Sequence, residues 1–433
     1  MTMIPLRISM MKLHPAPLLR ALLLCLAIGT AASAQSVEEG ARRDVEYLCS
    51  PGLRGRGYLA DGHLAAAAYI RDQFRSLGLD SLSDGYMQRF SVRLNEQMAS
   101  PHLRIDGREL RVGRDFLPDE RTGSGEITGP VTVVRAGSGS VMPEKGIDDY
   151  AGKDVAGAIV VIDEKSPAGA GYDERLRDAA ARGARGVIVL ADKLTYGEYG
   201  GTVRIPVLRA LRARIPQDIA TIELSTSGSM WGSITQNVVA VLPGKSVPDS
   251  LIILTAHYDH LGSIGDSIYF PGANDNASGV AMLLALARYF REHPLRYSIL
   301  FIACSGEEIG LVGSRYFVEH PLADLSRGRF VLNMDMAASG REGVMAVGGV
   351  DFPEEFELLK GVATTLGIDD MRKRENAPNS DHYFFVESGL RGFYIYPFTG
   401  LQPYHSVDDL PATLQWDVFT RLYDLMRLFL EKL

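Results

Sequence analysis

Histidine and carboxylate residues gather in short stretches of the second half of the chain. The stretches are "HYDHLG" from His257, "PGANDNASG" around Asp275, "CSGEE" ending in Glu307 and Glu308, "NMDM" around Asp335, and "YHSVDD" around His405. Two adjacent carboxylates normally repel each other, so the pair Glu307–Glu308 needs a compensating partner. A partner of opposite charge at this place would make the pair favourable.

The same stretches follow segments that are typical of buried strands. Continuous apolar runs occupy residues 251–256, 298–304, 329–334 and 390–398, as expected for parallel strands that are buried on both faces. Between the first two, residues 277–293 predict a helix with a buried stripe that includes Val280, Leu284 and Phe290, and Ser278 is a candidate cap at its start. The alternation predicts an α/β fold with a mixed, mostly parallel central sheet sandwiched by helices, and ligands in such sheets bind at the carboxyl ends of the strands.

Histidine combined with Asp and Glu, without cysteine, is the ligand chemistry of zinc and of harder divalent ions. In an extended segment His257 and Asp259 share a face, so the Asp259 carboxylate can hold the second ring nitrogen of His257. Two metal ions about 3.5–4 Å apart need a bridging carboxylate, further ligands and an unligated base. Adjacent glutamates become favourable there when one binds metal and the other faces the attacking water. We interpret His260 as a structural residue.

Other chemistries lack support in the sequence. No G-x-S-x-G surrounds any serine, so a nucleophile elbow is not indicated. The stretch "LPGKS" ends like a phosphate loop, but Val239 stands where the first glycine is required, and no G-x-G-x-x-G occurs.

Taken in order, the stretches above together with "SDHYFF" (380–385) resemble the M28 zinc peptidases, in particular their aminopeptidase group, over roughly residues 40–433. By position, the resemblance implies two zinc ions per chain with Asp275 bridging them. It implies that His257 and Asp335 complete one site, that Glu308 and His405 complete the other, and that Glu307 is the general base, with Asp259 in a supporting catalytic role.

The sequence departs from this family at one position. Some members carry an oxyanion-stabilising tyrosine shortly before the "SDH" stretch, and here that segment reads "NAPNSDHYFF". Tyr383 or Tyr404 could take its place. We expect Asp381 and His382 to support the site rather than to bind metal.

Residues 121 to 235 show a separate pattern of short strands and a helix, distinct from the segments on either side. The stretch "DDYAGKDVAGAIVVID" (148–163) resembles a protease-associated (PA) domain, with a strand at 158–162, a helix, and two further strands near 186–191 and 203–210. We predict a small α/β or β-rich PA-like insertion at 121–235, joined by an exit linker at 228–236, within a catalytic domain formed by 35–120 and 236–433. The insertion could be a lid over the site or a surface that binds a partner.

The amino terminus has the pattern of a secretory signal. A basic start, an apolar run from Ala21 to Ile28 and the sequence Ala32-Ser33-Ala34 predict a signal peptide at 1–34 and an exported protein, periplasmic or extracellular. The formal net charge is −8, and removing this segment takes away only basic residues, so nucleic acid is not an expected partner. No later segment predicts membrane insertion, and we expect Cys304 to be a buried free thiol rather than a disulfide partner of Cys49.

These observations predict an exported zinc-dependent exopeptidase acting on peptides, most simply an aminopeptidase. The motif segments are rich in acids, whereas Arg315, Arg341 and Arg391 lie outside them, and a carboxypeptidase would need a cation for the terminal carboxylate. The alternatives are a carboxypeptidase, a glutaminyl-cyclase-like enzyme with one zinc, and a non-catalytic binding protein of the same fold. The sequence does not predict the oligomeric state.

Overall fold

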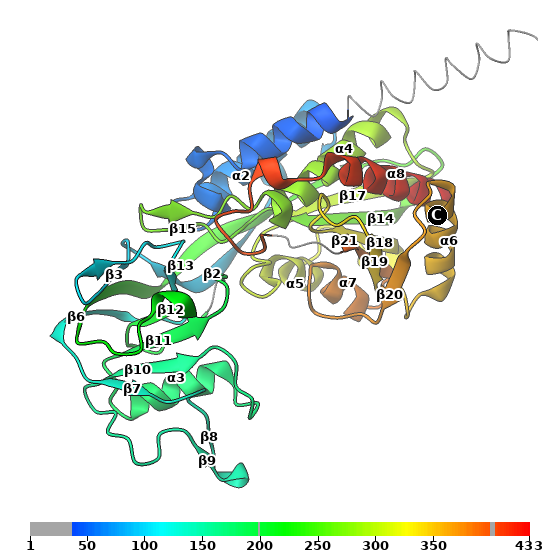
Figure 1. The fold of residues 1–433 in the computed structure, drawn as a ribbon. Coiled ribbons are helices and arrows are strands. Elements are labelled where there is room, and N and C mark those ends of the chain that lie inside the picture. The colour runs from blue at the N-terminus through cyan, green and yellow to red at the C-terminus, as the bar shows by residue number, and fades with distance from the viewer. Residues whose placement is uncertain (1–36, 198–199, 399–402) are drawn as a thin grey trace, which may run out of the picture.

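The computed structural model describes residues 37–197, 200–398 and 403–433. The predicted signal peptide, 1–34, lies outside the described residues. The described chain forms two lobes, which we call the larger lobe (residues 37–97 and 229–433) and the smaller lobe (residues 98–228) (Figure 1). Within the described residues, no helix combines the length and the apolarity that a membrane crossing requires.

The sheet of the larger lobe runs in the order β20-β19-β21-β18-β14-β17-β13. Its strands are β13 (Thr221–Leu242), β14 (Val247–His257), β17 (Tyr297–Cys304), β18 (Gly328–Met334), β19 (Gly343–Val347), β20 (Met371–Arg374) and β21 (Gly392–Phe398). The four apolar runs of the sequence are the central strands β21, β18, β14 and β17, and they pair in parallel. The sheet as a whole is mixed, because β19 pairs antiparallel with β21 and β13 pairs antiparallel with β17.

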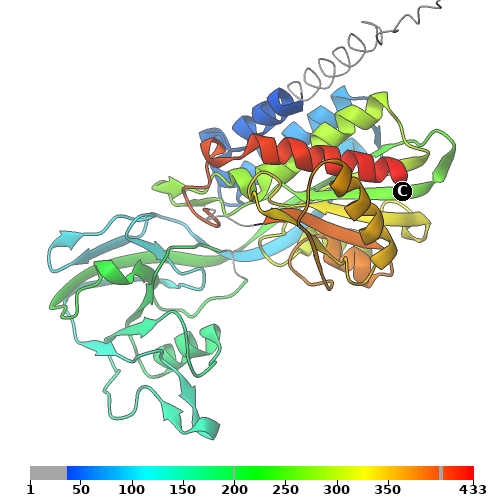
Figure 2. The same cartoon turned by 45° about the vertical axis from the view of Figure 1, so that its right-hand side comes forward.

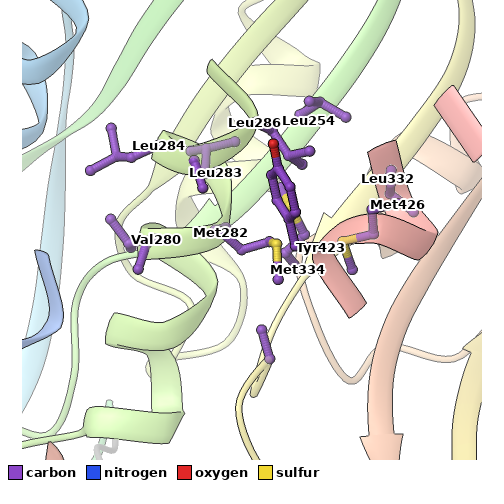
Figure 3. Close-up of a cluster of buried hydrophobic side chains, with 14 of the residues drawn as sticks. Leu254, Val280, Met282, Leu283, Leu284, Leu286, Leu332, Met334, Tyr423 and Met426 are labelled. Carbon is purple, nitrogen blue, oxygen red and sulfur yellow. The ribbon is translucent and has the colours of Figure 1, made fainter. Parts of the chain in front are cut away.

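Helices cover both faces of this sheet. One face carries α2 (Gly62–Ser76), α4 (Gly279–Glu292), α6 (Pro353–Thr365) and α8 (Trp416–Lys432). The other face carries α5 (Val312–Glu319) and α7 (His382–Glu387), whose Phe317 and Phe385 pack on Ile253 and Leu300. Figure 3 shows part of the first core, where Met282 and Leu286 of α4 and Met426 of α8 lie close to Leu254 and Leu332 of the sheet.

Local details at the start of α4 differ from expectation. Ser278 does not cap the helix, because its backbone is already helical and its hydroxyl makes no capping bond. The hydroxyl instead donates to the carbonyl of Asn274 and accepts from the backbone N–H of Ala337. Ser278 therefore ties the loop before α4 to the segment after β18. Cys49 and Cys304 are buried free thiols, as predicted for Cys304.

The smaller lobe contains a five-stranded sheet in the order β5-β12-β11-β10-β7, with α3 (Tyr172–Ala181) packed on it. The strands are β5 (Phe116–Pro118), β7 (Val133–Arg135), β10 (Ile159–Asp163), β11 (Gly186–Ala191) and β12 (Val207–Leu211). A second layer pairs β3 (His102–Ile105) and β6 (Ser124–Pro130) with the first part of β13, and β4 (Arg108–Glu109) with β3. Because β3, β4 and β5 precede residue 121, part of the segment 35–120 lies in the smaller lobe. The smaller lobe also contains a short hairpin of β8 (Val141–Met142) and β9 (Ile147–Asp148). A similar hairpin of β15 (Ser263–Ile264) and β16 (Ile268–Tyr269) belongs to the larger lobe.

The lobes are joined by a two-stranded ribbon. β13 is one continuous strand of 22 residues. Its first part pairs with β6, its middle pairs antiparallel with β2 (Met87–Gln97), and its last part pairs with β1 (Asp80–Ser81) and β17. The segment 228–236, predicted as a linker, is therefore regular strand. The segment does lead from the smaller lobe into the larger one, and its long antiparallel partner β2 supplies the hydrogen bonds that keep it extended. Figure 2 shows this ribbon crossing from one lobe to the other.

Candidate active site

The predicted site residues lie at the carboxyl ends of the parallel strands. His257 is the last residue of β14, Asp335 follows β18 directly, and Glu307 and Glu308 lie in the turn after β17. Asp275 lies in the segment Ala273–Ser278 that leads into α4, and its own backbone is not helical (φ −110°, ψ 95°). His405 lies in the loop after β21. Because parallel strands place their carboxyl ends at one edge of the sheet, side chains far apart in sequence meet there.

Asp275 lies between two histidines and offers one oxygen to each. Nε2 of His257 is 3.3 Å from Oδ1 of Asp275 and 3.4 Å from Oδ1 of Asp335. Nε2 of His405 is 3.2 Å from Oδ2 of Asp275 and 3.1 Å from Oε2 of Glu308. Two ligand atoms that are each about 2.0–2.1 Å from a tetrahedral zinc ion lie roughly 3.3 Å apart. Both sets of separations therefore fit atoms that share a metal ion.

Unpartnered buried atoms point to the same conclusion. Among the described residues, Nε2 of His257 and Oδ1 of Asp335 have no hydrogen-bond partner although both are buried. Buried polar atoms are normally paired, because leaving one unpaired is costly. Ligand-capable atoms of His257, Glu307 and Asp335 also lie within 4.8 Å of one another. The same holds for His257, Asp275 and Glu308. The donor set, two imidazoles with carboxylates, is one that zinc takes.

Asp259 supports the site differently from the expectation. Nδ1 of His257 lies 3.2 Å from the backbone carbonyl of Asp259, whereas the nearer carboxylate oxygen is 3.8 Å away. That carboxylate instead accepts from the hydroxyl of Tyr58 at 2.9 Å and from the backbone N–H of Glu307 at 3.4 Å. Asp259 therefore holds the His257 ring through its main chain and positions the turn of Glu307 through its side chain.

Asp335 is held by a chain of hydrogen bonds that runs across the sheet. The hydroxyl of Ser380 donates to Oδ2 of Asp335 at 2.7 Å, and the amide of Asn333 donates to Ser380 at 2.7 Å. The hydroxyl of Thr255 in turn donates to Asn333 at 2.7 Å. With Oδ2 occupied, Oδ1 of Asp335 is left facing His257.

His260, which we interpreted as structural, contacts a candidate ligand. Its Nδ1 lies 2.6 Å from Oε1 of Glu308, so it holds that carboxylate while Oε2 faces His405. Burial lowers the pKa of His260, which favours the neutral ring. Burial opposes ionisation of Glu308, but His405 and His260 outweigh it and bring the pKa of Glu308 to about 2. The ring of His260 also packs against Gly272, where a β-carbon would approach to 2.3 Å.

The two adjacent glutamates differ in their environments. Burial raises the pKa of Glu307 well above its ordinary value, and the carboxylates of Glu308 and Asp335 add to this effect, while His257 opposes it. Glu307 is therefore the member of the pair that binds a proton more tightly, and Glu308 is the member that stays ionised. Groups with opposed pKa shifts are typical of acid–base chemistry.

Two residues that hold the Asp275 loop were not among the predicted site residues. Arg56 is fully buried and donates to the carbonyls of Tyr258, Pro271 and Gly272 at 2.7–2.8 Å. Asp409 accepts the backbone N–H groups of Asn274 and Asp275 at 2.9–3.1 Å. Asp409 belongs to the stretch "YHSVDD", so its sequence context pointed to the site. No feature of the sequence around Arg56 pointed to a role in the site.

The tyrosines and the "SDH" residues are also placed by the structure. The ring of Tyr404 stacks on His405 with centroids 3.8 Å apart. Tyr404 is 44% exposed. Partial burial and the carboxylates of Asp275 and Glu308 raise the pKa of Tyr404, so its hydroxyl lies close enough to these carboxylates to feel their charge. Asp381 and His382 are fully buried, and neither belongs to the two groups of ligand-capable atoms found among the described residues.

The part of the chain that carries the site also matches a known protein family. Residues 237–430 match the model of Peptidase family M28. This match covers a little less than half of the chain and shows that this region is similar to M28 peptidases. All the candidate ligands and Glu307 lie inside it.

Curated relatives extend the similarity. The chain is 29% identical to Aminopeptidase YwaD of Bacillus subtilis over 310 residues, which are 65% of each chain. It is 27% identical to the probable lipoprotein aminopeptidase LpqL of Mycobacterium tuberculosis over 302 residues, covering 66% of this chain and 56% of that relative. The match therefore spans less than two thirds of the length of either relative.

Solved structures share the fold of both lobes. A zinc aminopeptidase from Bacillus subtilis, BSAP, superposes with a TM-score of 0.69 at 22% identity, covering 91% of this chain and 94% of that one. An aminopeptidase from Aneurinibacillus sp. strain AM-1 gives a TM-score of 0.63 at 20% identity, covering 90% and 92%. Because coverage of this chain is at least 90%, the likeness includes most of the smaller lobe.

Proposed function

We propose that this protein is a zinc aminopeptidase that binds two zinc ions and removes residues from the amino terminus of peptides. The observation that carries the proposal is the placement of Asp275, with one oxygen 3.3 Å from Nε2 of His257 and the other 3.2 Å from Nε2 of His405. A single carboxylate between two histidine-centred groups is the arrangement that a two-metal site needs. The match of residues 237–430 to Peptidase family M28 and the names of the similar proteins support the proposal.

The residues present fit two zinc sites. His257 and Asp335 would hold one ion, Glu308 and His405 the other, and Asp275 would contribute to both. Bound zinc ions would supply the positive charge that polarises the scissile carbonyl and makes water a nucleophile at neutral pH.

Glu307 is the proposed general base. It lies beside His257 and Asp335. Burial raises the pKa of Glu307 well above its ordinary value, and the carboxylates of Glu308 and Asp335 add to this effect, so its ionised form is a stronger base than a free glutamate. In that ionised form it can take the proton of the attacking water and pass it to the leaving amine. Asp259 accepts the backbone N–H of Glu307 and so positions this base. Of the two tyrosines considered, Tyr404 is the better placed to donate to the carbonyl oxygen, since it stacks directly on His405.

The charges around the site favour recognition of a peptide amine. The three arginines that follow the motifs pair with acids elsewhere: Arg341 with Asp417, and Arg391 with Glu355. Arg315 is exposed and lies 4.0 Å from Glu319. Arg56 is buried and bonds backbone carbonyls. The terminal carboxylate that a carboxypeptidase must bind therefore lacks a cation from these four residues.

One peptide in three forms tests this proposal: with free termini, N-acetylated, and C-amidated. Zinc-loaded enzyme should cleave the free and amidated forms, and acetylation should abolish cleavage. Removal of metal with a chelator should abolish cleavage of all forms, and zinc should restore it. Cleavage of the free and acetylated forms but not of the amidated form would make the enzyme a carboxypeptidase. Full activity without metal would refute the zinc mechanism, and one bound zinc per chain would favour the cyclase-like alternative.

We further propose that the protein is exported and that the smaller lobe is PA-like. The predicted signal at 1–34 supports export, and the strand Ile159–Asp163 within the stretch 148–163 supports the PA-like assignment. Peptide substrates are the proposed partners.

A further inference from the structure

A loop of the smaller lobe makes direct contact with His405. Tyr196 lies between β11 and β12, and its carbonyl lies 2.8 Å from Nδ1 of His405. The backbone N–H of Tyr196 donates in return to the carbonyl of His405 at 3.1 Å. The two residues are thus joined by a reciprocal pair of hydrogen bonds that crosses from one lobe to the other.

This contact determines what the other ring nitrogen can do. A carbonyl only accepts, so Nδ1 of His405 must carry the proton. In a neutral ring Nε2 then carries the lone pair. Nε2 is the nitrogen that faces Asp275 and Glu308 at 3.2 and 3.1 Å. Metal-binding histidines in proteins depend on such a partner, and its loss typically lowers metal affinity about 10–100-fold.

His405 also needs help from its surroundings to keep its conformation. Its φ angle is +52°, in the left-handed region that residues other than glycine occupy only when surrounding contacts impose it. The hydrogen bond from Tyr196 to the His405 carbonyl is one such contact, and the stacked ring of Tyr404 is another.

The Tyr196 loop is in turn anchored by apolar packing against the larger lobe. Tyr196 is 7% exposed, and its ring stacks on Phe270 with centroids 5.1 Å apart and an interplanar angle of 7°. Leu117 of the smaller lobe and Leu261 and Ile264 of the larger lobe belong to the same buried cluster. An ion pair that also joins the lobes, Arg114 with Asp408 at 3.1 Å, is exposed and therefore weak.

We propose that the smaller lobe is a structural part of the metal centre: the carbonyl of Tyr196 fixes the tautomer of His405, so docking of this lobe sets the metal affinity of the site formed by Glu308 and His405. The inference rests on the proposed function for the ligand role of His405. A lid that only restricts access to the site would have no need to bond the ring of a ligand. Tyr196 is here a positioning residue, acting through its main chain and held by its ring.

The test compares Tyr196→Ala with Tyr196→Phe in the full-length protein. The alanine variant loses the stack on Phe270 that holds the loop, whereas the phenylalanine variant keeps it. Zinc is titrated against a chelator of known affinity, and the two sites are distinguished by ¹¹³Cd NMR of the cadmium-loaded protein. We expect Tyr196→Ala to weaken one of the two sites about 10–100-fold and to leave the other unchanged. Tyr196→Phe should bind as wild type.

Phe270→Leu provides a second variant from the larger lobe, since it keeps apolar volume but removes the aromatic stack. It should weaken the same site, by a smaller factor. Ile162→Val, a mild change in the smaller lobe's core away from the interface, should leave both sites unchanged. A folded Tyr196→Ala or Phe270→Leu variant that binds both ions with wild-type affinity would overturn the inference. If wild-type protein fails to bind two ions, the proposed function fails instead.

Discussion

Replacement of His260 by leucine should weaken one metal site selectively. The side chain is fully buried, and its Nδ1 lies 2.6 Å from Oε1 of Glu308. Because burial lowers the pKa of His260, the ring is neutral and donates one hydrogen bond to the carboxylate. Leucine roughly fills the space but offers no donor, so Glu308 loses the bond that directs Oε2 toward His405. Asparagine is the matched control, since its amide can donate from nearly the position of Nδ1.

The expected size of this effect follows from the contact. A hydrogen bond to a charged group contributes about 1.5–3 kcal/mol. Since each 1.4 kcal/mol is tenfold in an equilibrium constant, zinc affinity at the site of Glu308 and His405 should fall about 10–150-fold. The site of His257 and Asp335 should keep its affinity, because Asp335 is held by Ser380.

Chelator competition measures the affinities, and ¹¹³Cd NMR shows which site has changed. His260→Leu should perturb one cadmium resonance, and His260→Asn should largely restore it. Ser380→Ala should perturb the other resonance. If His260→Leu leaves both affinities within threefold of wild type, or if it and Ser380→Ala weaken the same site, our account of how Glu308 is held is wrong.

The remaining predictions concern the base, the pH dependence and the buried arginine. Glu307→Gln should lower kcat about 10²–10⁴-fold with metal content unchanged, whereas Glu308→Gln should also lose metal; exchanged phenotypes would reverse the two roles. Burial lowers the pKa of His257 and His405, but neighbouring carboxylates outweigh it and raise both well above 6.5. Zinc must therefore displace protons, and its affinity should rise with pH through the neutral range; calorimetry showing a pH-independent affinity from pH 6 to 8 would contradict this. Arg56→Met leaves buried carbonyls unpaired, at about 1–3 kcal/mol each. Urea unfolding should show a loss of at least about 3 kcal/mol, and a loss below 1 kcal/mol would refute the role of Arg56.

Much of the larger lobe could be predicted because its signals are local. Continuous apolar runs identify β14, β17, β18 and β21, and the polar residues after each run then meet at one edge through the parallel topology. His257, Asp275, Glu308, Asp335 and His405 could therefore be expected to lie together before any geometry was known. Their metal-binding roles remain proposals.

What could not be predicted depends on contacts that leave no pattern in side-chain types. Arg56 looks like a surface residue in sequence, and only the fold shows it buried among backbone carbonyls. The carbonyls that face His257 and His405 belong to Asp259 and Tyr196, and main-chain atoms are the same in every residue. The linker segment 228–236 could not be predicted to be regular strand, because its partner strand, β2, lies more than 130 residues earlier in the chain.

The continuity of β13 limits how the two lobes can move relative to each other. The single strand β13, 22 residues long, runs through both lobes. Its middle part is paired antiparallel with β2. Such a ribbon can twist and bend, but it resists shear because sliding would break a whole ladder of hydrogen bonds at once. Movement between the lobes should therefore be a flexing of limited range, and the two lobes should unfold in a single cooperative transition.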